Sequence, residues 1–289
     1  MSTKSLNSFF LFIVVSCWAY GQSFHDQVRF LEHLETIGEY KEALFYIDQL
    51  HEQGGLSSFE MDSLFFFEGR YHYELKEIEQ SIAAFNSVGV RSKSLHEISS
   101  IYAGFQLSYL RKFEEAEQRF DSFQSSDSLR LALVNYQKAS LSLLQRNLDQ
   151  FNHYANRFND TYYVLTDYQK DMTGIYQELA KHKRKSPFVA GLLSAIIPGS
   201  GKLYNGQIGP GVMGLVSTGI FGLQAYEGYR KDGLKSARFI IFGGLFTTFY
   251  VANIWGSVVS VRVSEQRYNH TVDEAIYINM HLPIRLLYR

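Results

Sequence analysis

Apolar side chains recur with a helical period in the first half of the chain. In each of four segments, an aromatic or aliphatic anchor is followed by apolar or small side chains about 3, 7 and 10 residues later. This spacing places the four positions of a segment on one stripe of an α-helix. The segments are 38–50, 74–88, 110–123 and 145–158, and their anchors Tyr40, Ile78, Phe113 and Leu148 lie 38, 35 and 35 residues apart.

A second set of positions predicts a partner helix in front of each segment. Nine residues before the anchors stand Leu31, Gly69, Gly104 and Ala139, and a glycine at two of these sites leaves room for close helix packing. With both sets, residues 25–180 resemble the tetratricopeptide repeat family. The fourth copy departs from the pattern at Phe151, and the first lacks the glycine, so these copies are expected to be distorted or to act as end caps.

The resemblance implies a solenoid of stacked helical hairpins whose concave face binds peptides. Exposed polar and aromatic side chains on the first helix of each pair are the candidates for such a groove. The same residues also fit a buried core, and one sequence does not separate the two locations. The candidate groove residues are Tyr71, Tyr73, Gln106 and Tyr109.

Two long stretches without a charge follow in the second half, at residues 208–226 and 239–261. Each reaches the roughly 20 residues that a helix needs to cross a bilayer, so the pattern predicts a membrane helical hairpin. Small residues recur every fourth position on both stretches, and we expect the helices to pack through these faces. The packing residues are Ala252, Gly256 and Ser260 on the second stretch and Thr218 and Gly222 on the first.

The stretch 188–206 is apolar only as far as Pro198, which is too short to span a membrane. It also lacks the G-x-x-x-x-G-K-S/T spacing of a phosphate-binding loop, because Lys202 is followed by Leu203. A short re-entrant or interfacial helix is predicted instead. The motif S-P-x-x-A-x-x-x-S-x-x-x-P-G-x-G-x-x-Y-N-G resembles an uncharacterised membrane domain of bacteria, chiefly Bacteroidetes, with no known activity. Its turn contains Pro198, Gly199, Gly201, Tyr204, Asn205 and Gly206.

The N-terminus has the pattern of an export signal. Lys4 precedes an apolar run, and Ala19-Tyr20-Gly21 forms a small-x-small cleavage site, which predicts a signal peptide over residues 1–21. The chain's one cysteine, Cys17, lies within it, in a sequence that also resembles a bacterial lipobox. Removal of the segment, lipidation of Cys17 and an uncleaved anchor all stay open. After simple cleavage the chain has no disulfide or cysteine-bound zinc.

Charge sets the expected topology. The net charge of -1 gives no general attraction to nucleic acid. Basic residues dominate the loop between the charge-free stretches, so the positive-inside rule places this loop in the cytoplasm and residues 25–180 in the periplasm of a bacterial inner membrane. The cluster 181–185 would then lie outside, in contact with anionic lipid headgroups or an acidic partner. The opposite arrangement, in which residues 188–206 span, stays open.

No constellation for catalysis, cofactor or metal binding is visible among the scattered histidines and serines, so no enzyme activity is expected. The sequence therefore predicts an all-α chain with a repeat domain at 25–180, a membrane domain at 186–263 and a tail at 264–289 that forms a strand or lies on the membrane surface. The expected function is a scaffold of the cell envelope that recruits a protein partner. In the alternative, the membrane domain is an oligomeric carrier or lipid-handling element, and the repeats regulate it.

Overall fold

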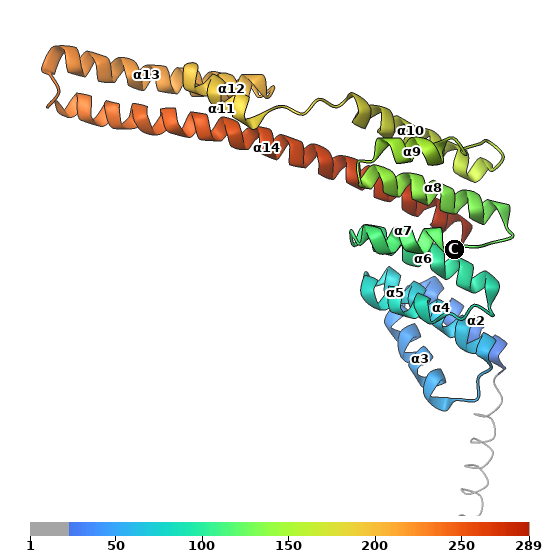
Figure 1. Cartoon of the computed structure of the whole chain (residues 1–289). Helices are drawn as coiled ribbons and strands as arrows, with labels where there is room; N and C mark the ends of the chain where they lie inside the picture. The colour runs from blue at the N-terminus through green and yellow to red at the C-terminus, as the bar shows by residue number, and fades with distance from the viewer. Residues whose placement is uncertain (1–22, 289) are drawn as a thin grey trace, which may run out of the picture. The chain divides into compact units, whose positions relative to one another are not determined.

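The computed structural model describes residues 23–288, and these residues form helices joined by short turns, without a strand (Figure 1). They divide into two compact units. The N-terminal unit contains the chain up to Thr173 and also the last residues from Tyr277, whereas the hairpin unit contains Gly174–Ile276. Residues 277–288 are called the C-terminal segment below. The predicted signal peptide, with Cys17, lies outside the described residues.

The N-terminal unit is built from consecutive helix pairs, and from α2 to α9 each helix packs against the next along the chain (Figure 1). The first helices of the pairs are longer than the second in all but the first pair. The pairs are α2 (Phe24–Ile37) with α3 (Tyr40–Gln53), α4 (Ser58–Glu74) with α5 (Ile78–Ser87), α6 (Lys93–Tyr109) with α7 (Phe113–Asp121), and α8 (Ser128–Leu144) with α9 (Leu148–Ala155), followed by α10 (Tyr163–Lys181).

The same turn closes the first helix of every pair. Two residues before each anchor, the backbone takes a left-handed conformation, and the next residue donates its N–H to a carbonyl five residues back, which is the Schellman arrangement. The left-handed residues are Gly38, Lys76, Arg111 and Arg146, with φ of 81°, 66°, 60° and 60°. The repeat spacing seen in the sequence is therefore a repeat of backbone geometry.

The helical stripe lies in the interior as its spacing predicted. Ala43, Ile47, Phe85 and Phe120 are almost fully buried. The two glycines permit the close approach, since a Cβ at Gly69 would lie 2.7 Å from the Phe85 ring and one at Gly104 would lie 2.4 Å from the Phe120 ring.

The hairpin unit contains α11 (Pro187–Ile196), α12 (Ser200–Tyr204), α13 (Ile208–Asp232) and most of α14 (Ala237–Leu287). Both α13 and α14 are long and apolar enough to cross a membrane, as the two charge-free stretches predicted. They run antiparallel, because Gly214 lies next to Asn253 and Gly228 lies next to Phe239.

The tail differs from the prediction. Residues 264–287 are neither a strand nor a separate surface element, because α14 continues without interruption to Leu287. The alternation around Ile276, Ile278 and Met280 suggested a strand, but Ile276 and Met280 are fully buried while Ile278 is exposed. A spacing of four residues between the buried positions is that of one helix face.

Candidate helix-binding groove and polar core of the hairpin

The C-terminal segment lies against the first helices of the later pairs. Aromatic rings from α4 and α6 contact it: Tyr73 and Phe105 approach His281 with centroid distances of 5.5 and 5.4 Å, and Tyr109 approaches Tyr277 at 5.4 Å. Phe105 and His281 stack within 15° of parallel. The face of α4, α6 and α8 that contacts residues 277–288 is called the groove below.

Two buried side chains of α8 bind the backbone of the segment. The hydroxyl of Tyr136 donates to the carbonyl of Asn279 at 3.0 Å, and the amide of Gln137 donates to the carbonyl of Met280 at 2.8 Å. In the opposite direction, the Tyr277 hydroxyl donates to the carbonyl of Ser108 at 3.2 Å. The groove therefore contacts both the backbone and the side chains of a helix.

Apolar burial anchors the same segment. Met280 and Ile284, which lie on one face of α14, are both 0% exposed. Burial raises the pKa of Tyr136 well above its usual range and that of Tyr102 to about 12, so both phenols stay protonated hydrogen-bond donors. The Tyr102 hydroxyl donates to the carbonyl of Tyr288, at the end of the segment, over 3.4 Å.

The four candidate groove residues divide into two classes. Tyr73 and Tyr109 contact the C-terminal segment, as a groove position requires. Tyr71 and Gln106 are fully buried and join neighbouring helices: Tyr71 donates to the carbonyl of Leu31, and Gln106 donates to the hydroxyl of Ser81 at 2.8 Å. The sequence analysis did not identify Tyr136 and Gln137. Both lie on α8, the first helix of the fourth pair, and no feature of the sequence there distinguishes them from core residues.

Two hollows remain beside the segment. The larger, about 550 Å³, is lined by residues of α2, α3, α4 and α6 and by Arg285, with Glu32, Glu35 and Glu74 supplying acidic groups and Arg70 paired with Glu35. The smaller, about 340 Å³, lies between Tyr73, Phe105, Tyr109 and Ile278 and is mainly apolar. Both offer further contact surface beside the groove.

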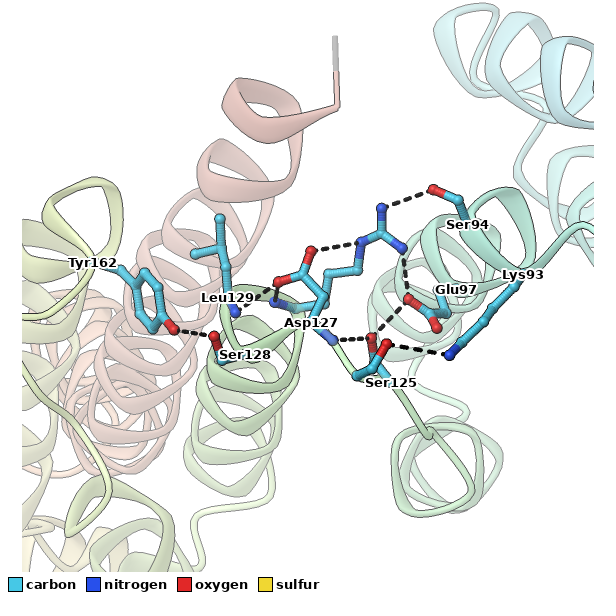
Figure 2. A network of polar contacts seen from close by, with 10 residues as sticks. Lys93, Ser94, Glu97, Ser125, Asp127, Ser128, Leu129 and Tyr162 are labelled. Atoms are coloured by element: carbon cyan, nitrogen blue, oxygen red, sulfur yellow. Dashed lines mark hydrogen bonds and ion pairs between the residues drawn. The ribbon is translucent and has the colours of Figure 1, made fainter.

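A polar network joins the third and fourth helix pairs (Figure 2). The guanidinium of Arg130, on α8, donates to Glu97 at 2.6 Å and to Ser94 at 2.8 Å, both on α6, and Ser125 donates to the same carboxylate oxygen of Glu97. The Glu97 side chain is only 5% exposed, so its charge depends on these partners. This network fixes the stacking of the pairs that form the groove.

In the hairpin unit, the glycines of the predicted turn are required by space. Gly199 has φ of 88°, and a Cβ there would lie 2.1 Å from the carbonyl of Gly211. A Cβ at Gly201 would lie 1.9 Å from the carbonyl of Ala190. The turn motif begins at Pro198, two residues after the end of α11, contains α12, and ends at Gly206 with φ of 84°.

Polar residues of this turn bind the neighbouring helices. The Ser194 hydroxyl accepts from the N–H of Gly201 at 3.0 Å, and the Asn205 amide donates to Ser264 at 2.9 Å and to Ser260 at 3.3 Å. The Tyr204 hydroxyl accepts from the N–H of Ser186 at 3.3 Å. Residues of the motif therefore hold α11 and α12 against α14.

The predicted packing residues of α13 face α14, whereas the buried row on α14 lies one residue away from Ala252, Gly256 and Ser260. Thr218 is 1% exposed and accepts from the Asn253 amide at 2.8 Å, and Gly222 faces the Phe246 ring. On α14, however, Ala252 is exposed, and Gly256 and Ser260 are only half-buried. The buried row is the next one, Asn253 and Ser257.

Asn253 packs against Gly214 of α13, where a Cβ would lie 2.3 Å from its amide oxygen. Asn253 also accepts from Lys202 at 3.3 Å and donates to the carbonyl of Gly214 at 3.2 Å, while Ser257 bonds to Ser194 at 2.7 Å. Gly256 and Ser260 lie at the border of this face, against Lys202 and Asn205 respectively. In the part of the chain that the structure describes, no group of three His, Cys, Asp or Glu side chains could hold a metal ion.

Comparison with protein-family models, with curated proteins and with solved structures finds no match for this chain.

Proposed function

We propose that this chain is a protein-interaction scaffold of the bacterial cell envelope, anchored in the inner membrane by α13 and α14. The N-terminal unit, a tetratricopeptide-like solenoid in this proposal, recruits a protein partner to that membrane. The observation that supports it most directly is the groove: its aromatic rings and its buried donors already bind a helix, the C-terminal segment. The residues that bind one helix suit recognition of another.

The hairpin supports the anchoring role. Two helices of sufficient length and hydropathy lie next to each other, and their polar groups, such as Asn253 and Thr218, bond to one another. Buried polar groups that are satisfied between helices stabilise a membrane hairpin. With the basic loop between the helices in the cytoplasm, both ends of the hairpin face the periplasm, which agrees with delivery by a signal peptide.

Sidedness and anchoring can be tested directly. Reporter fusions at residues 180, 233 and 289 are expected to be periplasmic, cytoplasmic and periplasmic. The chain freed of residues 1–21 should require detergent to stay in solution. If it is monodisperse in plain buffer, or if the fusion at residue 180 is cytoplasmic, the proposed envelope scaffold is wrong.

Partner recruitment needs a site-specific probe. A photo-crosslinking amino acid in place of Tyr40, which lines the larger hollow, should capture a protein in cells. The matched control is the same substitution at Tyr163, which is 87% exposed at the start of α10. Identical products at both sites, or none at Tyr40, would contradict recruitment through the concave side.

The alternative function, an oligomeric carrier or lipid-handling element in the hairpin unit, is favoured by one observation. The ammonium of Lys202 lies 3.3 Å from Asn253, in the polar core beside α14, where a charge is costly and often functional. Substitution of Asn253 and Tyr204 separates the two functions. Loss of function while crosslinking at Tyr40 is retained would favour the alternative over the scaffold.

A further inference from the structure

The C-terminal segment contains a proline within its helix. Pro283 lies inside α14, four residues after Asn279. Proline has no N–H, so it cannot donate the helical hydrogen bond to the carbonyl four residues before it, and its ring pushes that carbonyl aside. The carbonyl of Asn279 therefore receives no helical hydrogen bond from residue 283.

The groove supplies a donor at this carbonyl. The Tyr136 hydroxyl lies 3.0 Å from the Asn279 oxygen, and the Gln137 amide lies 2.8 Å from the next carbonyl, that of Met280. Tyr136 and Gln137 are both 0% exposed, so their positions are fixed by the core of the N-terminal unit. Because the pKa of Tyr136 is raised by burial, it remains a donor across the physiological pH range.

Apolar side chains flank the proline at defined positions. Met280, three residues before Pro283, and Ile284, one residue after it, are both fully buried, whereas Leu286 is 60% exposed. Together these features define a signature: a helix with an internal proline, and a bulky apolar side chain three residues before and one after it. The carbonyl that loses its helical donor to the proline distinguishes such a helix from an uninterrupted one.

We propose that the groove is a receptor for proline-interrupted helices, that the C-terminal segment occupies it in the same molecule as a resident ligand, and that a partner helix with the same signature displaces it. This inference rests on the proposed scaffold function, since it names the class of partner and the contact that restrains recruitment. The charge of the segment also fits the concave side, because Arg285 lines the hollow that contains Glu32, Glu35 and Glu74.

Displacement is tested with the whole chain in detergent and a fluorescein-labelled peptide of residues 274–288. Met280→Glu places a charge at a buried position of the resident segment and should release it. The peptide is expected to bind this variant at least tenfold more tightly than the unaltered chain. The matched control is Leu286→Glu, an equal charge change at an exposed position, which should bind the peptide as weakly as the unaltered chain does.

Recognition of the proline is tested by a double-mutant cycle in the Met280→Glu chain. Tyr136→Phe removes the donor to the carbonyl of Asn279, and we expect about a tenfold loss of affinity for the peptide with its proline. For a peptide with Pro283→Ala, whose alanine N–H restores the helical bond, the loss should be below threefold. Equal losses for the two peptides would overturn recognition of the proline.

Two further outcomes would overturn the displacement. If Met280→Glu causes a large loss of helical circular dichroism from the whole chain, the N-terminal unit has unfolded. The segment is then an inseparable core helix rather than a ligand. If the peptide binds neither chain, the groove is not a receptor. Failure of the proposed scaffold is a separate result, because the reporter fusions and the detergent requirement do not depend on the peptide.

Discussion

The hydroxyl of Tyr136 donates a hydrogen bond to the carbonyl of Asn279, four residues before a proline that cannot donate one. These two residues are more than a hundred positions apart in the chain, and their contact joins the last helix to the fourth helix pair. It makes the groove of the N-terminal unit an occupied surface. Any partner of that surface competes with residues 277–288 or binds beside them.

Protonation of His281 should weaken the binding of the C-terminal segment. Burial against Tyr73 and Phe105, followed by the cations Arg285 and Lys76, lowers the pKa of His281 from its ordinary value of 6.5, and Glu74 opposes this shift. A lowered pKa in the folded state means that this contribution to stability is present above pH 6.5 and is lost as the pH falls through the folded value.

The measurement is the thermal stability of the unit between pH 7.5 and 5, followed by circular dichroism. His281→Phe keeps the ring stacking without a titrating group and should show a smaller decrease over this range. Parallel decreases in the two proteins would assign the pH dependence to other groups.

Gly104→Ala should destabilise the third helix pair. Its Cβ would lie 2.4 Å from the Phe120 ring, which is buried and has little room to move, so we expect a loss of about 1–3 kcal/mol in the free energy of unfolding. Gly174→Ala, in α10, is the control, because nothing lies within 4 Å of the added Cβ. Its helix propensity should leave stability unchanged or slightly raised. A control as damaging as Gly104→Ala would show that the steric argument fails.

Arg130→Met should strongly lower the free energy of unfolding, although the Arg130 side chain is partly exposed. It leaves the 5%-exposed Glu97 carboxylate without its guanidinium partner, at an expected cost of about 3 kcal/mol. The double variant with Glu97→Met should recover much of this loss, because no unpaired charge stays buried. Lys170→Met, which breaks an exposed pair with Asp167, should change the free energy of unfolding by less than about 0.5 kcal/mol. Additive losses in the double variant would contradict a charge-pair mechanism.

Asn253→Leu should weaken the pairing of α13 with α14. It removes the bonds to Thr218 and to the carbonyl of Gly214, and interhelical hydrogen bonds in membranes contribute about 0.5–2 kcal/mol. Titration with SDS in mixed micelles, followed by loss of helicity, measures this. Ala252→Leu tests the neighbouring face and should have little effect, because Ala252 is exposed. If Ala252→Leu destabilises the hairpin more than Asn253→Leu does, the packing face is the row of small residues that contains Ala252.

The sequence by itself determined the elements that depend on local spacing. A helix begins at each of the anchors Tyr40, Ile78, Phe113 and Leu148, as the apolar stripe after each anchor predicts. The same left-handed turn precedes every anchor, at the same spacing along the chain. The charge-free stretches likewise lie within α13 and α14. Gly69 and Gly104 could be assigned to close packing because only glycine leaves that space.

Tertiary structure decided what fills the groove and which face of α14 is buried. Local sequence shows that Pro283 deprives a carbonyl of its helical donor, but only the folded unit brings Tyr136 to it. The small residues on α14 pointed to the row of Ala252, whereas the buried row contains Asn253 and Ser257, whose hydrogen bonds reach other helices. Both decisions depend on contacts between residues far apart in the chain, which the period of a single helix does not encode.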